Sequence, residues 1–194
     1  MNNKAFFLIV IAFLGSVANQ LSAQLLSDVR SQKIGLINET LYLRKEISGG
    51  GIINLLDTNS RNVPGICNFD TNVLQAGRVV VFDQISINYK SAATSGLEGA
   101  LTYNSAAPKE LQNAIFVISQ NGRVVLSKPF TDIHNIGTGV NANDAYTELK
   151  ALCLLVDDKP ITMQLVFPPN VVLDPANKHY ISINLNGAQT VTKV

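Results

Sequence analysis

The sequence has 194 residues, of which 46% are hydrophobic and 15% are charged, and its formal net charge is +1. This composition supports a substantial core and excludes the class of disordered chains. The chain is nearly neutral and has no excess of basic residues, which sequence-independent binding of nucleic acid needs. No nucleic-acid partner is therefore predicted.

The chain begins with a short polar stretch and a strongly apolar run. Lys4 precedes ten apolar residues, namely Ala5, Phe6, Phe7, Leu8, Ile9, Val10, Ile11, Ala12, Phe13 and Leu14. Two small-residue exits follow, at residues 16–18 and before Gln24, as in a secretory signal peptide. The pure run is shorter than the roughly 20 residues of a membrane span, although residues 17–26 could extend the helix. Residues 1–26 are therefore predicted to be a cleaved export signal or, as the alternatives, a retained membrane anchor or an element buried in the core.

Residues 27–74 are predicted to be an N-terminal arm or linker with the first strands. Within them, residues 34–37 and 40–43 could be short strands or part of a helix, because their apolar period is ambiguous. Residues 75–194 are predicted to be the core of a β-sandwich.

This core region shows alternating apolar residues and turn residues typical of antiparallel strands. Residues 79–89 predict a long strand, and residues 114–119 and 123–127 predict a hairpin around Asn121-Gly122. Residues 100–103 are a candidate short strand. Asn143 or Asp144 could cap a short helix over residues 145–149.

Three further strands are predicted toward the C-terminus. Residues 151–156 and 161–167 are expected to form a pair joined by a polar turn, and residues 180–185 to form a last strand that Asn186-Gly187 ends. The fold class predicted is all-β, an antiparallel sandwich or jelly roll of about seven or eight strands with one short helix, preceded by an N-terminal hydrophobic helix.

Residues that could carry chemistry are few and scattered. His134 and His179 have no metal-ligand spacing, and Asp157-Asp158 precede Lys159-Pro160 as in a turn. The sequence therefore predicts no catalytic, cofactor-binding or metal-binding residues, no small-molecule substrate and no enzymatic activity.

Cys67 and Cys153 are the two cysteines of the chain. An exported protein could pair them in a disulfide. The alternative is a buried free thiol, which suits the apolar surroundings of Cys153.

Three segments together suggest a family: residues 77–87, residues 115–126, and the closing stretch from 165–170 through 180–185. In them the chain resembles single jelly-roll capsid or vertex (penton) proteins of tailless, membrane-containing bacteriophages. The resemblance implies a structural subunit of a virion that packs against copies of itself and neighbouring structural proteins in a shell above a lipid membrane. The N-terminal hydrophobic segment departs from this family, whose subunits generally lack one; it would fit a subunit that is anchored in the membrane of the virion.

A second resemblance competes with the first. Leu21-Ser22-Ala23-Gln24 is similar to the end of export signals in Bacteroidetes-type bacteria. This resemblance implies a periplasmic or cell-surface β-sandwich module for binding or adhesion, with a cleaved signal peptide.

Overall fold

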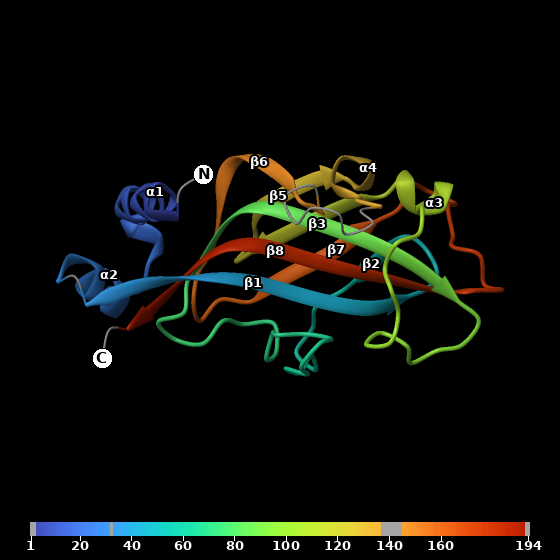
Figure 1. The fold of residues 1–194 in the computed structure, drawn as a ribbon, viewed down its shortest axis with the longest axis horizontal. Helices are drawn as coiled ribbons and strands as arrows, with labels where there is room; N and C mark the ends of the chain where they lie inside the picture. The colour runs from blue at the N-terminus through green and yellow to red at the C-terminus, as the bar shows by residue number, and fades with distance from the viewer. Residues whose placement is uncertain (1–2, 32, 137–144, 193–194) are drawn as a thin grey trace.

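The computed structural model describes residues 3–31, 33–136 and 145–192, and it contains two four-stranded antiparallel sheets (Figure 1). The first sheet has the order β1 (Ile34–Ile47), β8 (Lys178–Thr192), β3 (Val80–Ala92) and β6 (Thr147–Leu155). The second has the order β2 (Ile52–Asn54), β7 (Ile161–Val166), β4 (Ile115–Gln120) and β5 (Arg123–Pro129). The predicted antiparallel β character is confirmed: the described chain is mainly β, with a few short helices.

Short helices complete the described chain. They are α1 (Asn3–Ser16), the 3-10 helix η1 (Ala18–Gln20), α2 (Ala23–Arg30), α3 (Lys109–Gln112) and α4 (Phe130–Ile133). Figure 1 places α1 and α2 together at one end of the sheets, beside the start of β1 and the end of β8.

The main core lies between the two sheets, because alternate residues of each strand point inward. Phe82 of β3 and Ile183 of β8 contribute from the first sheet, while Phe116 of β4 and Leu165 of β7 contribute from the second; each is at most 1% exposed. The interior of the sandwich is thus filled by apolar side chains.

The ambiguous region near residues 34–43 is one continuous strand. β1 pairs with β8 over its whole length, from Ile34 opposite Thr192 to Ile47 opposite His179. Pairing with residues of β8 that lie 140 to 158 positions later, from Leu43 opposite Ile183 to Ile34 opposite Thr192, therefore decides a period that the local sequence left open.

The predicted hairpin is confirmed. β4 and β5 pair directly across Asn121 and Gly122, which have φ angles of 52° and 74°. These positive angles are what a tight type I′ turn requires, and Asn and Gly adopt them readily.

The prediction of a helix over residues 145–149 is wrong where the structure describes it. β6 already begins at Thr147, which pairs with Ile85, and Glu148 pairs with Gln84. Pairing with β3 overrides the local helical preference of this stretch. The expected caps, Asn143 and Asp144, lie outside the described residues. The candidate short strand over residues 100–103 is not formed, since residue 100 lies in a turn and residues 101–103 have no regular secondary structure.

The expected pair of strands around residues 157–160 is also not a hairpin, because β6 and β7 belong to different sheets. The Gln120 side chain holds the crossing segment: its Nε2 donates to Val156 O at 2.8 Å and its Oε1 accepts from Val156 N at 2.9 Å. Asp157 is buried and accepts from Gly77 N at 2.7 Å, so it anchors the crossing and does not form an exposed turn.

The last strand does not end at Asn186-Gly187 but continues to Thr192. Gly187 lies opposite Phe82, where the register of β3 shifts between Phe82 and Gln84. A Cβ atom at Gly187 would overlap the carbonyl oxygen of Val81 and the Cα of Phe82. The glycine is therefore a close-approach position inside the sheet and not a turn residue.

Candidate functional site

The apolar N-terminal run forms helix α1, and one face of that helix packs on the outer face of the first sheet. Val10 and Leu14, one turn apart, are 0% and 2% exposed. They belong to a second apolar cluster with Val81 of β3, Ala188 of β8, Val79 just before β3 and Val156 just after β6. The first sheet is thus covered on both faces at this end.

The described chain after α1 does not extend the helix to membrane-spanning length. α1 ends at Ser16, η1 and an extended Leu21 follow, and α2 starts anew after its N-cap Ser22. A helix of 14 residues is about 21 Å long, against roughly 30 Å for the apolar layer of a bilayer. Within residues 3–31, 33–136 and 145–192, no helix is long and apolar enough to cross a membrane. The expected extension of the helix through residues 17–26 is therefore wrong.

Polar contacts fix the connection between the two helices to the sandwich. The Ser22 hydroxyl accepts from Leu25 N at 3.4 Å and donates to Asp157 Oδ2 at 3.3 Å. Lys159 Nζ donates to Gln20 O at 3.4 Å. The buried carboxylate of Asp157 therefore has two roles: it holds the crossing from β6 to β7, and it accepts a hydrogen bond from the residue that caps α2.

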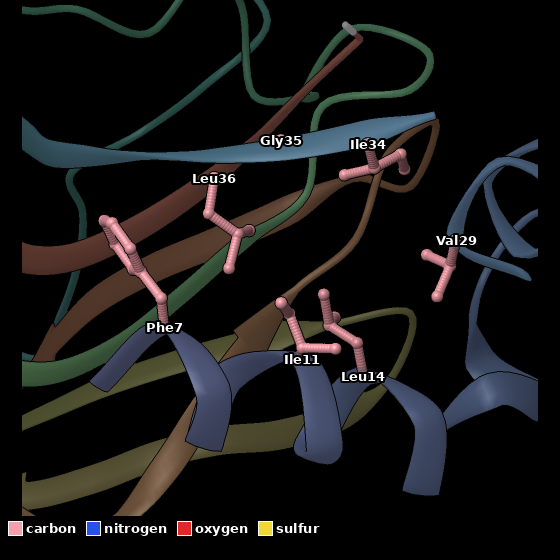
Figure 2. A pocket seen from close by; sticks show the side chains of 7 residues that line it. All are labelled: Phe7, Ile11, Leu14, Val29, Ile34, Gly35 and Leu36. Atoms are coloured by element: carbon pink, nitrogen blue, oxygen red, sulfur yellow. The ribbon is translucent and has the colours of Figure 1, made fainter. Parts of the chain in front are cut away.

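An open groove of about 530 Å³ lies between α1, α2 and β1 (Figure 2). The residues that line it carry apolar side chains or, at Gly35, none: Phe7, Ile11 and Leu14 of α1, Val29 of α2, and Ile34, Gly35 and Leu36 of β1. Figure 2 shows these side chains converging on one space, so the helices and the strand build it jointly.

The opposite side of α1 faces outward and is also apolar. Leu8, Ile9 and Ile11 are 68%, 47% and 52% exposed. Ile11 belongs to both features, since it lines the groove and is half exposed. The groove and the outer face of α1 therefore form one continuous apolar surface, which we call the α1 surface.

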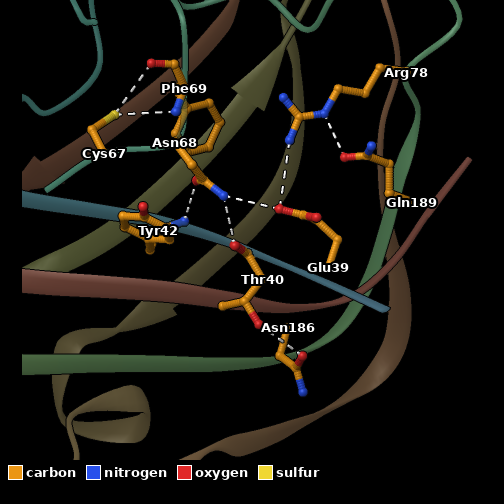
Figure 3. A network of polar contacts seen from close by, with 9 residues as sticks. All are labelled: Glu39, Thr40, Tyr42, Cys67, Asn68, Phe69, Arg78, Asn186 and Gln189. Atoms are coloured by element: carbon orange, nitrogen blue, oxygen red, sulfur yellow. Dashed lines mark hydrogen bonds and ion pairs between the residues drawn. The ribbon is translucent and has the colours of Figure 1, made fainter. Parts of the chain in front are cut away.

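A polar network protects the free edge of β1 (Figure 3). Asn68 Oδ1 accepts from Tyr42 N at 2.7 Å, and its Nδ2 donates to Thr40 O at 2.9 Å and to Glu39 Oε1 at 3.1 Å. Arg78 Nη2 lies 3.8 Å from Glu39 Oε1. The Asn68 side chain thus occupies backbone groups that a strand of another chain would otherwise pair with.

Cys67 and Cys153 are both buried and free, so the disulfide is not formed. The backbone of Cys67 pairs with that of Leu43 at the edge of β1, whereas Cys153 lies in β6. These strands are the two edges of the first sheet, about 14 Å apart at the usual strand spacing. Burial raises the pKa of the Cys153 thiol to about 11 and raises that of Cys67 as well.

Both histidines have structural partners. His134 Nδ1 lies 3.0 Å from Ile87 O, and its Nε2 accepts from Ala107 N at 3.2 Å. His179 is 4% exposed, with Nδ1 at 2.6 Å from Tyr89 Oη and Nε2 at 2.9 Å from Asp174 O. Its strand β8 lies inside the first sheet, between β1 and β3.

Sequence reasoning identified the residues of α1 but missed the surface that receives them. A signal for that surface exists in residues 79–82 and 152–156, where apolar residues follow one another without alternation. Such runs are typical of strands buried on both faces. The role of Asp157, by contrast, depends on contacts 80 and 135 residues away and has no local signal.

Neither a protein-family model nor a curated protein matches the chain. Among solved structures, a chain of the acidic stable capsid structure of Helicobacter pylori bacteriophage KHP30 matches over 81% of this chain and 98% of that chain. The sequence identity is 10% and the TM-score is 0.34. The match lies in the class that the sequence resembles, phage capsid proteins, but at this TM-score it carries no argument about function.

Proposed function

We propose that the chain is a non-enzymatic structural subunit of a virion, a capsid or vertex protein that assembles with copies of itself and with neighbouring structural proteins. The observation that carries the proposal is the pairing of the strands. β1 pairs with β8, β2 with β7, β3 with β6 and β4 with β5. This nested pairing in two four-stranded sheets supports a jelly roll, the eight-stranded double sheet of many viral capsid proteins.

Jelly rolls also occur in lectins and cupins. The filled interior favours a structural role, because residues of both sheets interdigitate between them and leave the outer surfaces for interactions. Few charges on those surfaces make close contact between copies electrostatically easy, since 15% of the residues are charged and the net charge is +1.

The second sheet offers one surface for such contacts. Val166 of β7 pairs with Ile52 of β2 on one side and with Ile115 of β4 on the other. Ile52 and Ile115 are 63% and 43% exposed, so this apolar row crosses three strands on the outer face. Association would remove these side chains from water.

Native mass spectrometry of the full chain over a range of concentrations tests the proposal. We expect closed oligomers, and Ile52→Asp should shift them toward monomer. Val124→Asp is the matched control, because Val124 on β5 is 65% exposed and should tolerate the charge without dissociation. A chain that stays monomeric at every concentration, alone and with the other structural proteins of its particle, would contradict the proposal.

A further inference from the structure

We infer that the α1 surface is an in-plane lipid-binding site, in which α1 lies along a bilayer surface and the groove receives a lipid acyl chain. This inference goes beyond the proposed function of a virion subunit, and it replaces the membrane-spanning anchor considered from the sequence with a peripheral contact.

The orientation of α1 follows from which of its sides the protein covers. Val10 and Leu14 are buried against the sheet, so the side of the helix that carries them is fixed on the protein and turned away from solvent. Leu8 and the flanking Ile9 and Ile11 project outward with about half or more of their surface exposed. A helix fixed in this way inserts its outer face into the boundary between headgroups and acyl chains without crossing the bilayer.

The groove continues this outer face into the protein. The side chains that line it are apolar, and one of them, Ile11, also belongs to the exposed face. A flexible acyl chain that leaves the bilayer at Ile11 would meet apolar side chains throughout the groove, where burial of its methylene groups is favourable.

The charges next to the groove favour an anionic lipid surface over a second protein copy. Arg30 follows the groove residue Val29, and Lys33 precedes the groove residue Ile34; both basic residues are exposed. The carboxylate of Asp28, on the same helix as Arg30, accepts two hydrogen bonds of 3.0 Å from Gln24. Exposed basic groups beside an apolar face complement phosphate headgroups.

Flotation of the full chain with vesicles tests the inference. The probes are phosphatidylcholine vesicles with and without one quarter phosphatidylglycerol, and the variant is Leu8→Asp. We expect the wild-type chain to float with the anionic vesicles, and Leu8→Asp to lower its partition at least about tenfold, because burial of one large apolar side chain is worth roughly that factor. Its unfolding midpoint should stay unchanged, because Leu8 is 68% exposed.

Val124→Asp is the control, since it places the same charge at an equally exposed apolar position on β5. Equal flotation of Leu8→Asp and the wild-type chain, equal loss in both variants, or no flotation of the wild-type chain would overturn the inference. An oligomer that Leu8→Asp dissociates in the absence of vesicles would overturn it too, since the α1 surface would then bind a second copy. Oligomers without flotation would refute the lipid site and leave the proposed function standing. Flotation of a chain that stays monomeric would refute the proposed function and leave the lipid site standing.

Discussion

Truncation of Leu14 tests whether α1 is an integral part of the folded protein. Leu14 is 2% exposed and contacts the cluster that covers the outer face of the first sheet. Leu14→Ala removes most of a buried side chain, and such changes cost about 2–5 kcal/mol. Leu14 also borders the open groove, so the change widens a space that is already open and leaves no closed void. We therefore expect a loss at the low end, about 2–3 kcal/mol.

Urea unfolding of the full chain measures this loss as a lower midpoint at an unchanged slope. In a domain of this size the same loss lowers Tm by about 4–12 °C. Leu8→Ala is the matched control, because it makes the same chemical change in the same helix at a side chain that is 68% exposed. It should change the stability by less than about 0.5 kcal/mol. Equal effects of the two substitutions, with the intact mass confirming that α1 is present, would refute the packing of α1 on the sheet.

Three further predictions concern the sandwich itself. Gly187→Ala should destabilise by several kcal/mol, because its methyl group meets backbone atoms of Val81 and Phe82; Gly15→Ala, where nothing lies within 4 Å, should be neutral or stabilising in thermal unfolding. Asn68→Ala should cost about 1–3 kcal/mol and increase light scattering at high concentration, since it frees backbone groups at the edge of β1; unchanged stability and scattering would contradict the protective role. Cys153 should resist alkylation in the folded chain. Because its pKa is raised on folding, the free energy of unfolding should fall between pH 9, where an unfolded thiol ionises, and about pH 11. A free energy of unfolding that is constant over this range would contradict the burial of Cys153.

Local sequence predicted the elements that local chemistry determines. The Asn121-Gly122 turn is an example, because two adjacent residues supply the positive φ angles that the hairpin needs. The start of β6 is the opposite case: Thr147 is drawn into a strand by Ile85, which lies about sixty residues earlier. Gly187 is a second such case. The local sequence predicts the end of a strand there, whereas the glycine permits the close approach of β3, which is a tertiary contact.

The candidate site shows the same division. The apolar character of residues 5–14 is plain in the sequence, whereas their two different faces are not, because apolar residues surround the helix on all sides. The sheet makes the distinction by burying Val10 and Leu14 and leaving Leu8 in solvent. The groove depends further on β1 and α2, whose positions follow from pairing with β8 and from the Ser22–Asp157 hydrogen bond.

The most direct test of the account is the intact mass of the native protein together with the fraction from which it purifies. The account predicts a mass that includes α1, from lipid-containing particles in which the chain is one of the structural proteins. A mass that begins at Gln24, from a cell-envelope fraction, would contradict it, because the chain would then be an exported module whose signal peptide has been removed.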